Sequence, residues 1–134
     1  MNRRKIISTN NQWEKRFGYA RVNQCENTIF IGGTVAIDPD GSPHAPGDAG
    51  AQTKRCYEII ENALVQLKLD RSIIMRSRIF VTDIAHADAV GNAHKSFFQS
   101  HNPCLTQVEV RSLIAPEFVV EIECDGYVLD SIKD

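Results

Sequence analysis

Hydrophobic and polar residues alternate most regularly in two stretches near the end of the sequence, 103–113 and 118–128. In the second stretch, Glu121 and Glu123 alternate with apolar residues. A period of two places successive side chains on opposite faces of a β-strand. Each stretch therefore predicts a strand with one apolar face and one face that carries ionisable groups. Because only a short link containing Pro116 separates the two strands, we expect them to pair antiparallel.

The first part of the chain predicts two more strands, at 18–22 and 28–37, joined by a turn. β-branched and aromatic residues dominate the second of these strands. Gly32 and Gly33 interrupt it, and glycine inside a strand is typical of a bulge or of a close approach by a neighbouring group. Residues 1–17 are polar and irregular, and we expect them to form a short edge strand or an arm that lies on the body.

Apolar residues at three- and four-residue steps predict two helices. Asp48 is expected to cap the first helix, because its side chain can accept a hydrogen bond from a free backbone N–H. The apolar stripe of this helix comprises Cys56, Ile59, Ile60, Ala63, Leu64 and Leu67. The second helix is expected to begin at about residue 83 or 84 and to end at Ser100, shortly before Pro103. Residues 73–82, between the helices, predict another strand.

The elements follow the order strand, strand, helix, strand, helix, strand, strand, with room for one further strand at the N-terminus. The simplest packing is one α+β domain over residues 1–134, in which a single mixed sheet of about six strands carries two helices on one face. The other face would then mix charged residues with Ile74, Phe80 and Val119. Apolar residues on such a face favour packing against neighbouring subunits.

Composition narrows the class of protein. With 134 residues, 43% of them hydrophobic and 24% charged, the chain is expected to fold as one soluble domain. Its net charge of −2 gives no general electrostatic reason to bind nucleic acid. No apolar run approaches the roughly 18 residues of a membrane span, and the basic N-terminus lacks the apolar run of a secretory signal. Four separated cysteines then indicate free thiols in the cytoplasm.

Short motifs follow one another in a defined order from about residue 13 to 128. They include Gly18-Tyr19, Ile31-Gly-Gly-Thr34, Gly47-Asp48, Arg78-Ile-Phe-Val-Thr-Asp83, Asn102-Pro103, Val108-Glu-Val110 and Val120-Glu-Ile-Glu123. In their order and spacing these motifs resemble the YjgF/RidA (Rid) family, also described as L-PSP endoribonuclease-like. The resemblance implies a chorismate-mutase-like α+β fold that assembles as a homotrimer. It also implies pockets for small molecules in the clefts between subunits.

The best understood branch of that family hydrolyses reactive enamines and imines to a 2-keto acid and ammonia. The resemblance implies that Glu121 positions or activates the water and that Tyr19 lines the pocket. An arginine in the family motif P-x-R binds the substrate carboxylate, but here the motif ends in Leu105. Leucine carries neither a charge nor a hydrogen-bond donor, so that contact is absent. A serine of the family's glycine-rich strand is also replaced, by Gly32.

Glu121 is the candidate catalytic residue, because partial burial of a carboxylate can raise its pKa toward that of a useful base. The alternative is a carboxylate on a solvated face, paired with Arg76 or Arg78. The candidate substrate-binding residues are Tyr19, Arg21, Gly32, Gly33, Leu105 and Gln107. Arg21 lies two residues from Tyr19, so in a strand both would point the same way and Arg21 would replace the missing cation. The alternative for Arg21 is an exposed position on an edge strand.

No cofactor or metal is expected. The four histidines lack the spacing of a metal site, and the Gly32-Gly33 pair matches no phosphate-binding loop. Cys104 lies next to the altered position, but no local histidine would activate it, and a buried thiol is the expected state.

Three functions remain open at this point. The first is a hydrolytic deaminase that acts on imines or enamines in the clefts of a trimer. The second is a trimer that binds small molecules or proteins without catalysis. The third, an endoribonuclease, is disfavoured by the acidic balance of the chain.

Overall fold

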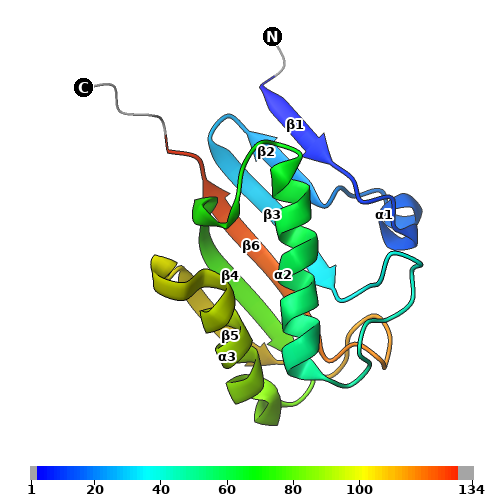
Figure 1. The fold of residues 1–134 in the computed structure, drawn as a ribbon. Coiled ribbons are helices and arrows are strands. Elements are labelled where there is room, and N and C mark those ends of the chain that lie inside the picture. The colour runs from blue at the N-terminus through cyan, green and yellow to red at the C-terminus, as the bar shows by residue number, and fades with distance from the viewer. Residues whose placement is uncertain (1–2, 130–134) are drawn as a thin grey trace.

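The computed structural model describes residues 3–129. Its six strands form one sheet in the order β1-β2-β3-β6-β4-β5, and α2 and α3 cover one face of it (Figure 1). The elements are β1 (Arg4–Ile7), α1 (Gln12–Phe17), β2 (Val22–Cys25), β3 (Thr28–Val35), α2 (Ala49–Val65), η1 (Arg71–Ile73), β4 (Ile74–Val81), η2 (Ile84–His86), α3 (Ala87–Phe98), η3 (Gln99–His101), β5 (Cys104–Glu109) and β6 (Val120–Tyr127). The predicted fold class is confirmed, and β1 is the additional N-terminal strand.

The N-terminal segment also contains a helix, α1, that the sequence pattern did not predict. The side chain of Asn11 caps it by accepting a hydrogen bond from the backbone N–H of Glu14 at 2.8 Å. Gly18 ends it in the left-handed conformation, with φ of 74°. The helix displaces the start of the next strand, so that β2 begins at Val22 and not at residue 18. Tyr19 and Arg21 consequently lie in the connection between α1 and β2.

The predicted antiparallel pairing of the two last strands is wrong. β4 lies between them and pairs parallel with β5 and antiparallel with β6. The strand β4, helix α3 and strand β5 form one crossover unit, and such a unit places its two strands side by side and parallel. The link after β5 then passes over the end of β4 to reach β6. Alternation in sequence identifies the two faces of a strand but not its neighbours in the sheet.

A bulge near the start of β4 changes which side chains reach the core. The pairing of β4 with β6 shifts register between Ile74 and Arg76. As a result Ile74, which was predicted on the outer face, is fully buried, and its neighbour Met75 is 38% exposed. Beyond the bulge, Arg76, Arg78 and Phe80 lie on the face away from the helices, as predicted. Val119, also expected on that face, packs partly against the core.

The core fills the space between the sheet and the two long helices. Asp48 caps α2 as predicted, by accepting a hydrogen bond from the N–H of Ala51 at 3.0 Å. The buried residues of α2 include Cys56, Ile60, Ala63 and Leu64 from the predicted stripe. Tyr57, outside that stripe, is also fully buried, because its hydroxyl donates a hydrogen bond to the Ser77 hydroxyl at 2.9 Å. A polar residue in the core thus has its partner within the sheet.

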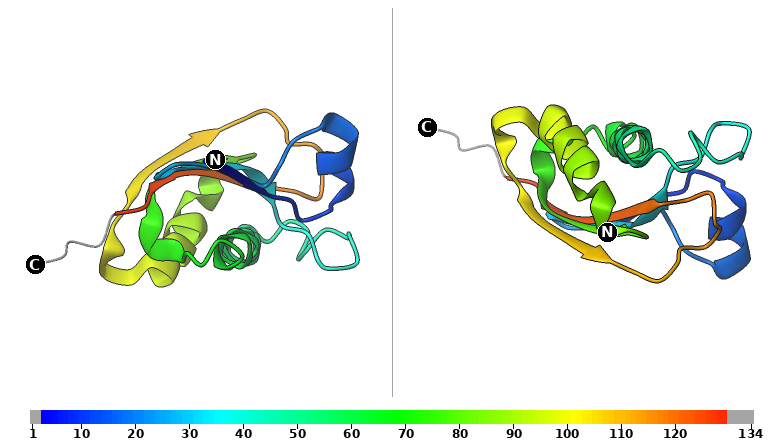
Figure 2. Two further views of the ribbon diagram at one scale, coloured as in Figure 1. Left: turned by 90° about the horizontal axis from the view of Figure 1, so that it is seen from above. Right: turned by 90° about the horizontal axis from the view of Figure 1, so that it is seen from below.

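The sheet face opposite α2 and α3 is largely uncovered. Figure 2 shows the sheet edge-on, with both helices on one side of it and α1 at one end. Apolar side chains are exposed on this face, among them Phe30 at 52% and Val108 at 42%. Arg78 lies among them and pairs with Asp125 at 2.9 Å and Glu123 at 3.7 Å. This combination of apolar and paired charged groups differs from an ordinary solvated surface.

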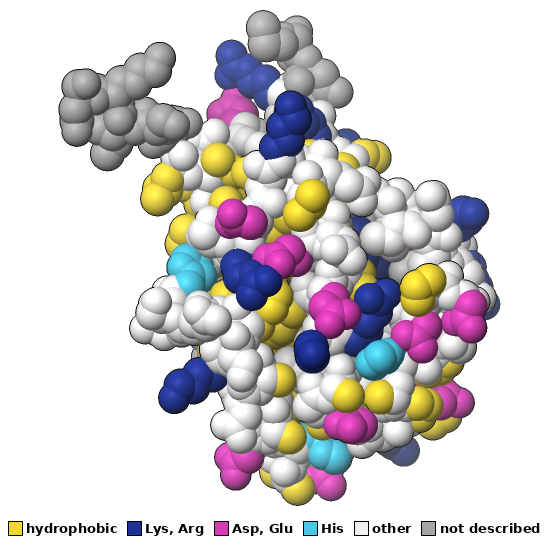
Figure 3. All heavy atoms as spheres, in the orientation of Figure 1, with side chains coloured by type: hydrophobic (Ala, Val, Ile, Leu, Met, Phe, Trp, Pro, Cys, Tyr) yellow, Lys and Arg dark blue, Asp and Glu magenta, His cyan; other side chains and the backbone are white. Residues whose placement is uncertain are grey.

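The opposite surface of the molecule, over α2, has a different character. Acidic and basic side chains lie side by side there (Figure 3), among them Lys54, Arg55, Glu58 and Glu61. This alternation of sign gives the α2 surface no continuous basic stripe. Within residues 3–129, no helix is both long and apolar enough to cross a membrane.

Candidate active site

A cavity of about 410 Å³ lies at the end of the sheet where α1, β3, β6 and the link between β5 and β6 meet. Its walls include Trp13 and Phe17 from α1, Tyr19 from the following connection, and Ile114 from the link. Glu121 of β6 and Gly33 of β3 also line it. Figure 2 shows that α1 and the 110–119 link reach the same end of the sheet.

Glu121 and Gly33 lie in close contact. A Cβ atom on Gly33 would be only 2.6 Å from Oε2 of Glu121, which is shorter than any stable contact. The pairing of β3 with β6 shifts register between Ile31 and Thr34, and this bulge contains Gly33. The glycine therefore makes the room in which the carboxylate lies, as its place in the strand indicated.

The surroundings of Glu121 suit a base. Burial raises the pKa of its carboxyl, the positive charge of Arg21 opposes that rise, and the negative charge of Glu123 adds to it. Among residues 3–129 Glu121 takes part in no ion pair, since Arg78 pairs instead with Asp125 and Glu123. The side chain is half-buried and faces the cavity.

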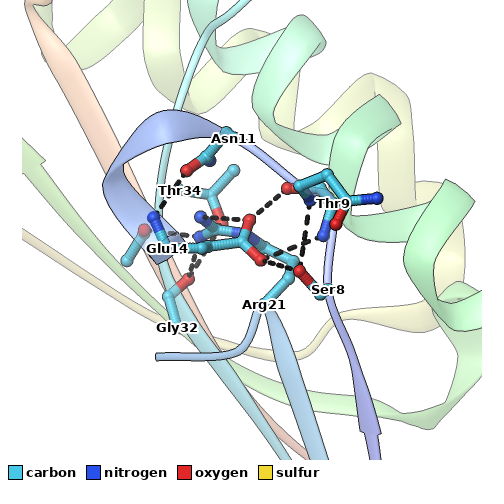
Figure 4. A network of polar contacts seen from close by, with 9 residues as sticks. Ser8, Thr9, Asn11, Glu14, Arg21, Gly32 and Thr34 are labelled. Carbon is cyan, nitrogen blue, oxygen red and sulfur yellow. Dashed lines mark hydrogen bonds and ion pairs between the residues drawn. The ribbon is translucent and has the colours of Figure 1, made fainter. Parts of the chain in front are cut away.

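Arg21 is buried, with only 2% of its surface exposed, so its expected alternative position on an exposed edge is wrong. Its Nη1 donates hydrogen bonds to the carbonyl of Gly33 at 2.6 Å and to the hydroxyl of Thr34 at 2.9 Å. Its Nη2 lies 3.4 Å from Oε2 of Glu14. In Figure 4 the guanidinium of Arg21 and the carboxylate of Glu14 point toward one another. The guanidinium is thus engaged within the protein.

Glu14 receives further hydrogen bonds on its other side. The Ser8 hydroxyl and the Thr9 N–H each donate to Oε1 at 2.9 Å, and the Thr9 hydroxyl donates to Oε2. Burial alone would raise the pKa of Glu14, but these hydrogen bonds and the charge of Arg21 outweigh it and lower the pKa below its usual value. Glu14 is therefore the ionised partner of Arg21, and the pair joins α1 to the bulge of β3.

Five of the seven predicted site residues line this cavity, namely Tyr19, Arg21, Gly32, Gly33 and Glu121. Leu105 and Gln107 do not. Leu105 is opposite Ser77 in the sheet and lies on the face that α2 and α3 cover. Gln107 lies on the same face and donates a hydrogen bond to the Ala87 carbonyl at 3.3 Å. Leu105 and Gln107 could therefore contact a ligand in this cavity only from a second copy of the chain.

Comparison with known proteins identifies the family of the chain. The model of the endoribonuclease L-PSP family matches residues 9–128. The chain belongs to this family. The match covers every element from α1 to β6, and it confirms the resemblance drawn from the sequence motifs.

Individual members of the L-PSP family show how far the similarity extends. A solved structure from Mycobacterium tuberculosis, described as a member of the YjgF/YER057c/UK114 family, has 34% identity, a TM-score of 0.84, and coverage of 93% of this chain and 99% of its own. An uncharacterised protein of Streptomyces coelicolor is 29% identical over 90% of both chains. A rat 2-iminobutanoate/2-iminopropanoate deaminase is 23% identical over 82% of this chain and 80% of its own length. The family thus includes imine deaminases.

The cysteines of this L-PSP family member lie apart from the cavity. Cys56 and Cys124 are buried, and burial raises the pKa of the Cys124 thiol to about 12. Cys104 is exposed on the edge strand β5, so the expectation that it is buried is wrong. Within the described part of the chain, no group of three or more His, Cys, Asp or Glu side chains is arranged to hold a metal ion.

The contact between Gly33 and Glu121 generates a first prediction. In Gly33→Ala the new methyl group would force the Glu121 carboxylate to move, and displacing a catalytic group by about 1 Å can reduce the rate about 100-fold. Stability should change by less than about 1 kcal/mol, because the end of a flexible side chain can move. The matched control is Gly50→Ala on α2, outside the cavity, whose Cβ would lie 3.7 Å from its nearest neighbour, the Ala89 carbonyl oxygen. Assays of turnover and of thermal unfolding on both variants measure the effect on activity and on stability. Equal activities would contradict the assigned role of Gly33.

The buried pair between Arg21 and Glu14 generates a second prediction. Arg21→Met leaves a buried carboxylate without its counter-ion and should lower the free energy of unfolding by about 3–5 kcal/mol. Adding Glu14→Gln removes that unpaired charge and should restore part of the loss. Urea unfolding of both single variants and the double variant gives the coupling energy. If the two effects simply add, the ion pair does not hold this end of the sheet together.

Proposed function

We propose that the protein is a hydrolytic deaminase that acts on a reactive imine or enamine in the cavity beside Glu121. The observation that carries this proposal is the half-buried carboxylate of Glu121, which faces the cavity without an ion-pair partner among residues 3–129 and whose pKa burial raises. Such a group is a stronger base than an exposed carboxylate. Membership of a family that includes imine deaminases supports the same reaction.

The reaction follows from the position of that base. Glu121 accepts a proton from a water molecule as the water oxygen forms a bond to the carbon of the protonated imine, and the π electrons of the C=N bond move to nitrogen. Glu121 then gives that proton to the nitrogen of the resulting carbinolamine, the C–N bond breaks, and ammonia leaves. The carbonyl product forms as the hydroxyl proton returns to solvent through Glu121. Tyr19 and the backbone at Gly33 shape the space around the reacting carbon.

A protein that binds a small molecule without turnover is the second candidate. Leu105 favours it, because the arginine that would bind a substrate carboxylate in the family motif is absent. An endoribonuclease has less support. The net charge of −2 gives no general electrostatic reason to bind a phosphate backbone, and the charges over α2 are mixed in sign (Figure 3).

Glu121→Gln separates the two leading candidates. If Glu121 is the base, the variant should release ammonia from a panel of imines about 100- to 10,000-fold more slowly than the wild type. The activity of the wild type should rise with pH as the pH passes the pKa of Glu121, which lies above the ordinary value of 4.5. Unchanged ammonia release in the variant would exclude Glu121 as the base.

Stability provides the control for that variant. The folded state raises the pKa of Glu121, so it favours the protonated carboxyl, and the stability that this group contributes falls as pH rises through the folded pKa. At pH 7 Glu121→Gln should therefore be as stable as the wild type or slightly more so. A loss of activity without a loss of stability assigns the effect to chemistry.

The uncovered sheet face leads us to propose that the chain forms a homotrimer through it. Phe30→Lys places a charge on this face at a side chain that is 52% exposed, so the isolated chain should fold normally. Light scattering should find three chains in the wild type and a single chain in the variant. The matched control is Val65→Lys, at a 59% exposed position on α2, which should remain a trimer. A trimer in both variants would place the interface elsewhere.

A further inference from the structure

The cavity beside Glu121 has an unbalanced charge. With Glu121 ionised, it contains one negative charge, because Arg21, the cation in its wall, is paired with Glu14 and both side chains are almost fully buried, at 3% and 1% exposure. The guanidinium also donates to the Gly33 carbonyl and the Thr34 hydroxyl. Glu14 therefore offsets the positive charge of Arg21 within the protein, while the Nε of Arg21 is buried and has no hydrogen-bond partner among residues 3–129.

The other charged groups nearby do not reverse this sign. Glu123, on the same face of β6, acts on Glu121 as a second negative charge. Arg78 is held by Asp125 and Glu123. Arg16 is exposed and lies over the ring of Phe17, with 5.1 Å between the guanidinium carbon and the ring centroid, but it does not line the cavity. Arg21 and Glu121 are the charged side chains among the described residues that line the cavity, and of these two only Glu121 lacks an ion-pair partner.

The walls of the cavity are aromatic and aliphatic. The rings of Trp13 and Phe17 are stacked, with 6.3 Å between their centroids and 9° between their planes. Phe17 is 57% exposed and Ile114 is 52% exposed, although both are large apolar side chains. Such a surface gains free energy when an apolar group covers it, and aromatic rings also attract cations to their faces.

From these two properties we infer that the site selects imines that are apolar and positively charged, and that it rejects 2-imino acids, whose carboxylate would face Glu121. The ligand class is a protonated imine, or an amine of the same shape, that carries an aromatic or branched alkyl group. This inference rests on the proposed function for its reaction but not for its binding. The balanced reaction converts the iminium ion and one water into a ketone or aldehyde and an ammonium ion: a C–O bond forms and the C–N bond breaks.

Three stable molecules of one shape test the charge preference without any turnover, namely benzylammonium, benzyl alcohol and benzoate. Trp13, the single tryptophan of the chain, lies in the cavity wall, so its fluorescence reports binding directly. At pH 7.5 benzylammonium should bind at least tenfold more tightly than benzoate, with benzyl alcohol between them. Glu121→Gln, which removes the charge and keeps the shape, should abolish this preference.

Several results would overturn the inference. Benzoate could bind as tightly as benzylammonium, the preference could persist in Glu121→Gln, or none of the three could bind at millimolar concentration. A turnover experiment separates this failure from that of the proposed function. Faster hydrolysis of 2-imino acids than of benzylic imines would overturn the selectivity and leave the deaminase intact. A tenfold preference for benzylammonium without ammonia release from any imine would uphold the selectivity and overturn the deaminase.

Discussion

The ion pair between Arg21 and Glu14 holds together the end of the sheet at which the cavity forms. Two opposite charges buried away from water are stable only when further hydrogen bonds complete their surroundings. Ser8 and Thr9 supply these for Glu14, and the Gly33 carbonyl and the Thr34 hydroxyl supply them for Nη1 of Arg21 (Figure 4). The Nε of Arg21 is the one buried nitrogen of this pair without a partner among residues 3–129. α1 has only six residues, too few for a helix that is stable in isolation. Its attachment through Glu14 therefore decides where Trp13 and Phe17 lie.

Most of the fold follows from local patterns in the sequence, but the order of the strands does not. The stripe on α2, its cap at Asp48 and the alternation in β6 were all readable, because each depends on residues close together in the chain. The position of β4 between β5 and β6 depends on the crossover through α3, which alternation cannot reveal. The bulge at Ile74 similarly reverses two side chains. β4 itself contains no glycine or proline, and the glycine at this point, Gly126, lies on the partner strand β6, so the sequence of β4 gives no local signal. For α1, Asn11 and Gly18 were adequate signals at its two ends, and the irregular polarity of residues 1–17 concealed them.

The site also combines features that the sequence predicts with features that only the folded structure defines. Family motifs led to Tyr19, Gly33 and Glu121, which lie together in the cavity. Ile114 was not predicted, because it comes from a link whose course only the packed structure defines. The environment of Arg21 was also beyond the sequence, since its counter-ion is seven residues earlier and belongs to an unpredicted helix. Chemistry at one residue was predictable, while the electrostatic balance around it was a property of the assembled fold.

The closeness of Gly33 to Glu121 has a consequence for how this family can diverge. A side chain at position 33 and a carboxylate at position 121 compete for one volume, so neither position can change freely while the other is kept. A lineage that retains the glutamate is confined to glycine at position 33, and a lineage that loses the glutamate is released from that restriction. In related sequences, glycine at position 33 should therefore occur together with glutamate at position 121, and other residues at position 33 should occur where the glutamate has been replaced.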